Sequence, residues 1–124
     1  KREGHDGRIY IGGMEQFGYF TPNRLGGLEY TCLSDSLSPN VNVGVIWNIL
    51  LDGERVYFQS DRRFFYWEEG IVKKIDYSSE IYTSFILRNK LYITSAEGLL
   101  MLNGTLTFAG LMLMSKKEKT PKAP

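Results

Sequence analysis

The side chains best placed to bind a ligand are polar residues in the short connections after the second strand of each repeated unit. A carboxylate accepts hydrogen bonds, whereas an arginine guanidinium donates two parallel hydrogen bonds to a carboxylate or to sugar hydroxyls. We therefore predict a ligand-contact surface, with ordinary surface charge as the alternative interpretation. Its residues are Glu15, Gln16, Asp61, Arg62, Arg63 and Glu97.

The sequence contains no arrangement of residues that is typical of catalysis or metal binding. The adjacent carboxylates Glu68 and Glu69 would point to opposite faces of a strand and cannot form an acid/base pair by themselves. The single histidine, His5, lies in a polar N-terminal stretch, and the single cysteine, Cys32, has no partner for an internal disulfide. We expect a protein that is not an enzyme, with no catalytic residues, no metal site and no cofactor.

Three aromatic residues, Trp47, Tyr66 and Trp67, could stack on a sugar ring. Each of them lies inside an apolar segment with the pattern of a strand. Buried aromatic rings contribute strongly to the cores between sheets. The sequence therefore favours a core position for all three over a place in a binding site.

The charge balance argues against nucleic acid and membrane partners. The chain carries 15 Lys and Arg against 14 Asp and Glu, for a net charge of +1, which creates no long-range attraction for anionic surfaces. The apolar run Leu99–Met114 is shorter than the roughly 20 residues of a spanning helix. It is also interrupted by Asn103–Gly104, a pair typical of a hairpin turn. We expect no nucleic acid partner and no membrane contact by this segment.

Short antiparallel strands must position these residues. Aromatic residues make up 14% of the chain, and its 13 glycines suit tight turns. Within 45–75, four apolar segments are separated by turn pairs such as Asp52–Gly53 and Glu69–Gly70. The pattern recurs within 81–109, and no window has a good helical period. The sequence predicts an all-β fold with two consecutive four-stranded antiparallel meanders and essentially no helix.

The second strands of the units share a repeated pattern of an apolar residue, a tyrosine and another apolar residue. The tyrosines Tyr10, Tyr57 and Tyr92 lie 47 and 35 residues apart, which suits β-propeller blades of about 40–50 residues. A four-stranded blade with two apolar faces buries both of them only by stacking between other blades. We predict about two and three-quarter blades within residues 1–114, followed by a polar Lys/Pro-rich tail at 115–124. The blades are 8–33, which lacks its first strand, 45–75 and 81–109.

The segments that carry a family likeness come from all three units. They are Gly7–Gly13 with Phe17–Phe20 and Leu28–Tyr30, then Val45–Trp47 with Val56–Ser60, and then Leu91–Ile93 with Gly98–Leu100. Together they resemble the β-propeller sensor region of Bacteroidetes-type two-component regulators and related triple-tyrosine-motif regulators. The chain has no kinase motif, helix-turn-helix or Ig-like tyrosine domain, so the resemblance extends to the sensing scaffold alone and assigns no ligand contact.

The resemblance implies an extracytoplasmic module, on the periplasmic or extracellular side of the cytoplasmic membrane, that senses a ligand. In this family the ligand is often a carbohydrate, and the signal passes through a membrane helix to a kinase or DNA-binding module. We expect a segment of a longer chain whose partners are its remaining blades or other copies of itself, with a carbohydrate or small acidic ligand. A small lectin that completes a propeller by self-association and a purely structural repeat are the alternatives.

An incomplete set of blades leaves two blade faces without a covering sheet. We expect side chains such as Tyr57, Phe65 or Tyr92 to be exposed there, and the segment to self-associate or to need the rest of a longer chain. The incomplete first blade also leaves an edge that recruits a strand. The run Leu111–Met114 is a candidate for that strand.

Overall fold

The computed structural model describes residues 2–3, 7–53, 55–60, 63–76, 80–102 and 108–110. Strands contain 61% of these described residues. None of them lies in an α-helix, and the one helical turn among them is the short 3-10 turn η1, Ser34–Ser36. The prediction of an all-β fold is confirmed.

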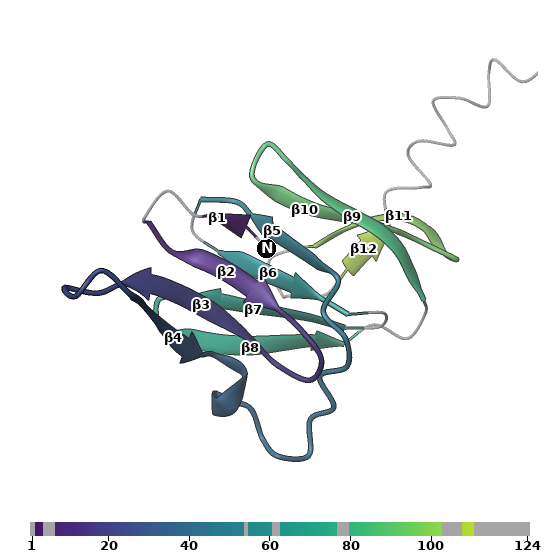
Figure 1. Ribbon diagram of the computed structural model, residues 1–124. Coiled ribbons are helices and arrows are strands. Elements are labelled where there is room, and N and C mark those ends of the chain that lie inside the picture. Colours follow the sequence, from purple (N-terminus) through teal and green to yellow (C-terminus); the bar gives the residue numbers. More distant parts are fainter. Residues whose placement is uncertain are drawn as a thin grey trace, which may run out of the picture. The chain divides into compact units, whose positions relative to one another are not determined.

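The strands form three antiparallel four-stranded sheets in which the strand order follows the sequence (Figure 1). The first sheet contains β1 Arg2–Glu3, β2 Ile9–Gly12, β3 Phe17–Pro22 and β4 Leu28–Cys32. The second contains β5 Asn48–Leu51, β6 Val56–Gln59, β7 Arg63–Glu68 and β8 Ile71–Asp76. The third contains β9 Ile81–Leu87, β10 Lys90–Ser95, β11 Gly98–Leu102 and β12 Phe108–Gly110.

Both predicted meanders are present, but the first unit differs from the prediction. Strand β1 pairs with β2 through the register Arg2↔Tyr10 and Glu3↔Ile9, so the first sheet does not lack its first strand. The N-terminal residues were expected to be a polar tail, yet backbone pairing at a sheet edge requires no apolar side chain. The candidate donor strand Leu111–Met114 lies outside the described residues.

Local backbone conformation determines the shape of two hairpin turns. In the β7–β8 turn, Glu69 and Gly70 have φ values of 52° and 81°. In the β9–β10 turn, Arg88 and Asn89 have φ values of 53° and 65°. Positive φ at both central residues defines the type I′ turn, whose twist matches the twist of the two flanking strands. These turns therefore fix the registers of both hairpins.

The chain divides into two compact bodies, the first ending at Asp76 and the second beginning at Tyr77. In the first body, the first and second sheets form two layers that pack face to face. The ring of Phe17 stacks on Phe58 with centroids 4.3 Å apart and lies 5.2 Å from the ring of Phe65. All three side chains are fully buried, so this aromatic contact forms the centre of the core.

Both faces of the second sheet are buried. The face toward the first sheet includes Ile49, Phe58 and Phe65, while the opposite face includes Leu50, Tyr57, Phe64, Tyr66 and Ile75. This explains why the sequences of β6 and β7 are continuous apolar runs rather than alternations of apolar and polar residues. The expectation that Tyr57 and Phe65 are exposed is wrong, because their side chains are only 2% and 0% exposed.

In the second body, the third sheet has one buried and one partly exposed face. Leu91, Ile93 and Leu100 are buried on one side. On the other side, the rings of Phe85 and Tyr92 stack at 5.4 Å with an interplanar angle of 11°, and Tyr92 is only partly buried. Within the part of the chain that the structure describes, no helix is long and apolar enough to cross a membrane.

Candidate ligand-binding rim of the first body

Four of the six predicted site residues are described, and they lie in or directly beside the connections between second and third strands. Glu15 and Gln16 lie between β2 and β3, Arg63 begins β7, and Glu97 lies between β10 and β11. Asp61 and Arg62 lie outside the described residues. Glu97 belongs to the second body, where its backbone N–H donates to Ser95 Oγ at 3.1 Å. Of the predicted site residues, Glu15, Gln16 and Arg63 are therefore the described ones that belong to the first body.

Residues 42–47 join the two connections of the first body. The guanidinium of Arg63 donates a hydrogen bond to the carbonyl oxygen of Asn42. The backbone N–H of Ile46 donates to the Gly13 carbonyl at 3.0 Å, and that of Trp47 donates to the Gln59 carbonyl at 3.0 Å. The β2–β3 and β6–β7 connections therefore lie at the same end of the two packed sheets. We call this end the rim.

Glu15 holds the crossing segment in place. Its backbone has a φ of 64°, and its N–H donates to the Gly44 carbonyl at 2.8 Å. Its carboxylate accepts hydrogen bonds from the N–H groups of Val43 at 3.2 Å and Gly44 at 3.0 Å. A carboxylate with two backbone donors is a strong structural fastener, so Glu15 supports the rim as well as bordering it.

A hollow of about 310 Å³ opens at this rim beside Glu15. Its remaining lining residues are Ser34, Asp35, Leu37, Ser38, Pro39, Val41 and Val43. The volume is at the lower end of the range for small-ligand sites. The carboxylates of Glu15 and Asp35 provide acceptors for hydroxyl or ammonium donors. We call this feature the rim hollow.

Exposed apolar side chains accompany the crossing segment. Met14 and Val45 face each other across an isolated antiparallel bridge, and both are exposed. Trp47 is 50% exposed, while the intervening Ile46 is buried. The expectation of a core position is wrong for Trp47, because the segment passes over the rim before β5 begins. Tyr66 is buried and Trp67 partly buried, as expected.

A second hollow, of about 360 Å³, lies on the first sheet and was missed by the sequence reasoning. Its lining residues are Ile11, Gly12, Gly13, Gln16, Phe20 and Tyr30. The hydroxyl of Tyr30 donates to Gln16 Oε1 at 3.2 Å, and burial, helped by nearby Cys32 and Asp35, raises the pKa of Tyr30 to about 12. We call this feature the sheet-face groove. The sequence feature that could have indicated this groove is Gly18 in the middle of a strand, because a glycine there often marks a place where another group approaches the backbone closely.

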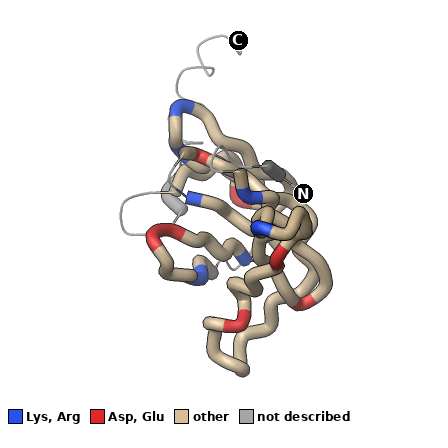
Figure 2. The backbone as a smooth tube through the Cα atoms, turned by 60° about the vertical axis from the view of Figure 1, so that its left-hand side comes forward, with Lys and Arg blue, Asp and Glu red and all other residues tan. Residues whose placement is uncertain are grey.

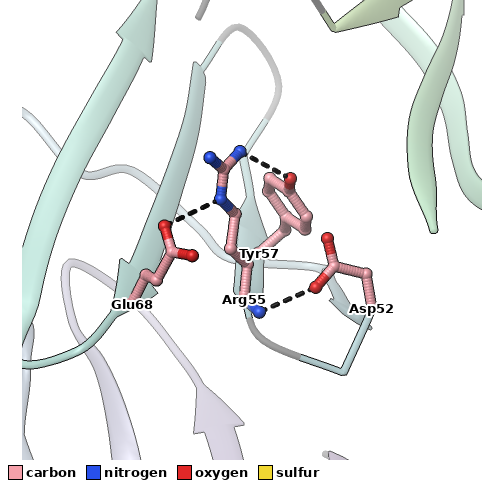
Figure 3. Close-up of polar contacts among 4 residues, drawn as sticks. All are labelled: Asp52, Arg55, Tyr57 and Glu68. Atoms are coloured by element: carbon pink, nitrogen blue, oxygen red, sulfur yellow. Dashed lines mark hydrogen bonds and ion pairs between the residues drawn. The ribbon is translucent and has the colours of Figure 1, made fainter. Parts of the chain in front are cut away.

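The opposite end of the second sheet contains a polar cluster that fastens its own strands (Figure 3). Arg55 Nε lies 3.0 Å from Glu68 Oε1, and Arg55 Nη1 donates to the Tyr57 hydroxyl at 3.3 Å. Burial opposes the charge of Arg55, but the hydrogen bonds to Tyr57 and Glu68 outweigh it and raise its pKa. Asp52 accepts from the Arg55 N–H at 2.7 Å. These residues form hydrogen bonds with one another, so we infer that they stabilise the second sheet.

Charges of both signs are spread over the described residues. Acidic and basic positions are interspersed along the described backbone in Figure 2, and no group of three His, Cys, Asp or Glu within those residues could hold a metal ion. Glu68 pairs with Arg55, while Glu69 lies in the β7–β8 turn.

No protein-family model matches the chain, and no curated protein or solved structure matches it either. Function must therefore be inferred from the residues and geometry of this chain.

Proposed function

We propose that the chain is a non-catalytic, ligand-sensing segment of a β-propeller in a signal-transduction regulator, positioned on the periplasmic or extracellular side of the membrane. The observation that carries the proposal is a repeated pair of tyrosines between second and third strands. Tyr10 faces Tyr19 in the first sheet, and Tyr57 faces Tyr66 in the second. Their ring centroids are 5.7 Å and 6.0 Å apart. A recurring cross-strand pair is what a repeat of one supersecondary unit produces.

Face-to-face stacking gives further support to a propeller. Two consecutive sheets pack through apolar faces in the first body, and the second sheet buries both of its faces. Sheets of a propeller need a neighbour on each face, since a single sheet cannot bury two apolar surfaces. The remaining sheets would come from a longer parent chain or from other copies of this one.

The rim hollow supports ligand recognition at the end where two connections meet. Its geometry is set by the hydrogen bonds of Glu15 and Arg63 to residues 42–44. A site held in its binding geometry before the ligand arrives avoids the cost of ordering on binding. The hollow is lined by carboxylates and serine hydroxyls, and the exposed ring of Trp47 lies on the crossing segment outside that lining. These groups recognise hydroxyls and ring faces, which supports binding of a carbohydrate or a small polar ligand.

A small lectin that completes a propeller by self-association is the second candidate. The exposed indole of Trp47 favours it, because an exposed aromatic face can stack on a sugar ring. The complete parent gene discriminates the two candidates. A membrane segment with a kinase or DNA-binding module favours the sensor, whereas a secretion signal with no output module favours the lectin.

Ligand binding can be tested by titrating the isotope-labelled chain with neutral sugars and small carboxylic acids while recording backbone amide shifts. We expect the shifts to gather at residues 15–16, 34–47 and 63. Trp47→Ala, Arg62→Ala and Arg63→Ala should weaken binding, whereas Leu25→Ala, at a side chain 95% exposed in the β3–β4 turn, should not. Binding that is unchanged in all three variants would reject Trp47, Arg62 and Arg63 as ligand contacts.

A further inference from the structure

The outer face of the first sheet, opposite the core, presents a continuous apolar surface. Its cross-strand neighbours are Ile9 with Phe20, Ile11 with Gly18, and Phe20 with Tyr30. Phe20 and Tyr30 have ring centroids 5.0 Å apart, and Tyr30 is 39% exposed. The sheet-face groove lies within this surface, so the surface is hollow as well as apolar.

Glycines lie at the hollow and beside it. Gly12 and Gly13 line it, and a Cβ added at Gly18 would lie 2.1 Å from the Thr31 carbonyl oxygen and 2.9 Å from the Tyr30 hydroxyl. Gly18 therefore lets the ring of Tyr30 lie across the strand. An apolar hollow with aromatic walls receives an apolar or aromatic side chain best, because unfilled space forfeits dispersion contacts.

In the contact between the first and second sheets, a tyrosine-bearing face of one sheet packs on an aliphatic and phenylalanine-bearing face of the other. The tyrosine-bearing face of the first sheet, with Tyr10, packs on the face of the second sheet that carries Val56 and Phe58. The ring of Tyr10 lies 6.3 Å from that of Phe58. In the repeated pattern, Val56 and Phe58 correspond to Ile9 and Ile11 of the first sheet. By this correspondence, the outer face of the first sheet, with Ile9 and Ile11, is the surface on which a tyrosine-bearing face of another sheet would pack.

The third sheet presents such a tyrosine-bearing face. Tyr92 occupies the position of Tyr10 in the repeat, and its ring stacks on Phe85, which is 38% exposed. Lys90, two residues before Tyr92 on the same strand, is exposed on this face, and Arg88 is exposed in the adjoining turn. On the first sheet, the negative charge of Asp35 acts on Tyr30. Both faces therefore present exposed aromatic rings, with basic side chains beside the face of the third sheet and the carboxylate of Asp35 near that of the first.

We propose that the outer face of the first sheet binds the tyrosine-bearing face of the third sheet from a second copy of this chain. The proposal rests on the propeller architecture proposed above and names the partner of its uncovered faces. Such a contact is heterologous, since two different surfaces meet. Two copies contribute six sheets, a number within the range of about four to eight at which propellers close.

The test combines analytical ultracentrifugation with one charge-introducing variant on each face, Tyr30→Arg and Phe85→Arg. The wild-type chain should associate over a micromolar concentration series. Each variant alone should associate more weakly, by a factor on the order of 30 or more, because each loses a central aromatic contact. An equimolar mixture of the two should form a one-to-one complex through the one interface that remains intact.

Other outcomes overturn the proposal. A wild-type chain that stays monomeric, or a Phe85→Arg variant that associates as well as wild type, would show that the second copy does not use these faces. Leu25→Arg is the matched control for an added charge, and circular dichroism checks each fold. If an arginine variant unfolds, Tyr30→Ser and Phe85→Ser replace the pair in the mixing experiment. Ligand shifts at the rim are a separate readout, so a monomer that binds ligand refutes this contact alone.

Discussion

Glu15 and Gly44, 29 residues apart in the sequence, hold each other through two reciprocal hydrogen bonds. The Glu15 N–H donates to the Gly44 carbonyl at 2.8 Å, and the Gly44 N–H donates to Glu15 Oε2 at 3.0 Å. The pair joins the β2–β3 turn of one sheet to the segment that leads into the next. A residue predicted as a ligand contact therefore also determines the shape of the rim.

We expect Glu15→Ala to destabilise the chain by about 1–3 kcal/mol, because the N–H groups of Val43 and Gly44 lose their acceptors. Urea unfolding measures the change. Glu29→Ala, at an exposed position on β4, is the control and should change stability by less than about 0.5 kcal/mol. Equal effects of the two substitutions would contradict a fastening role for Glu15.

Gly12 and Gly13 should respond very differently to the same substitution. A Cβ at Gly12 would lie 2.3 Å from Ile46 Cγ2, whereas a Cβ at Gly13 would meet no atom within 4 Å. Gly12→Ala should therefore cost about 1–3 kcal/mol through overpacking, and Gly13→Ala should be nearly neutral. Thermal unfolding of the two variants side by side checks this, and a neutral Gly12→Ala would mean that β2 and Ile46 are farther apart.

Trp47→Ala should leave stability within about 0.5 kcal/mol of wild type, because the indole is half exposed. Phe58→Ala, in contrast, should cost about 3–5 kcal/mol, since it removes a fully buried ring from the contact with Phe17. Denaturant titrations of both variants provide the comparison. A large loss of stability for Trp47→Ala would show that the indole is part of the packed core.

The raised pKa of Tyr30 makes stability depend on alkaline pH. The phenol has an ordinary pKa of 10.0, and burial raises it to about 12 in the folded chain. Its contribution is therefore complete below pH 10 and is lost as the pH rises toward 12. Tyr30→Phe should reduce the loss of stability between these pH values relative to wild type. Parallel pH dependences in the two proteins would show that Tyr30 titrates as an exposed phenol.

The sequence by itself was enough to predict the meanders, because each depends on neighbouring residues. The turn pair Glu69–Gly70 adopts positive φ with little help from distant contacts, and the apolar runs of β6 and β7 select strands. The correspondence of Tyr10, Tyr57 and Tyr92 as second-strand residues follows from the repeat and is confirmed by the strand order.

Only the tertiary structure decided what the side chains do. The pairing of Glu15 with Gly44 and the exposure of Trp47 both depend on where residues 42–47 cross the rim, which no local pattern encodes. The same holds for β1, whose place at the sheet edge is given by backbone pairing rather than by side-chain type. Local dihedral preferences act over a few residues, whereas burial and long-range hydrogen bonds are set when the sheets pack, and these decide which polar residues remain available to a ligand.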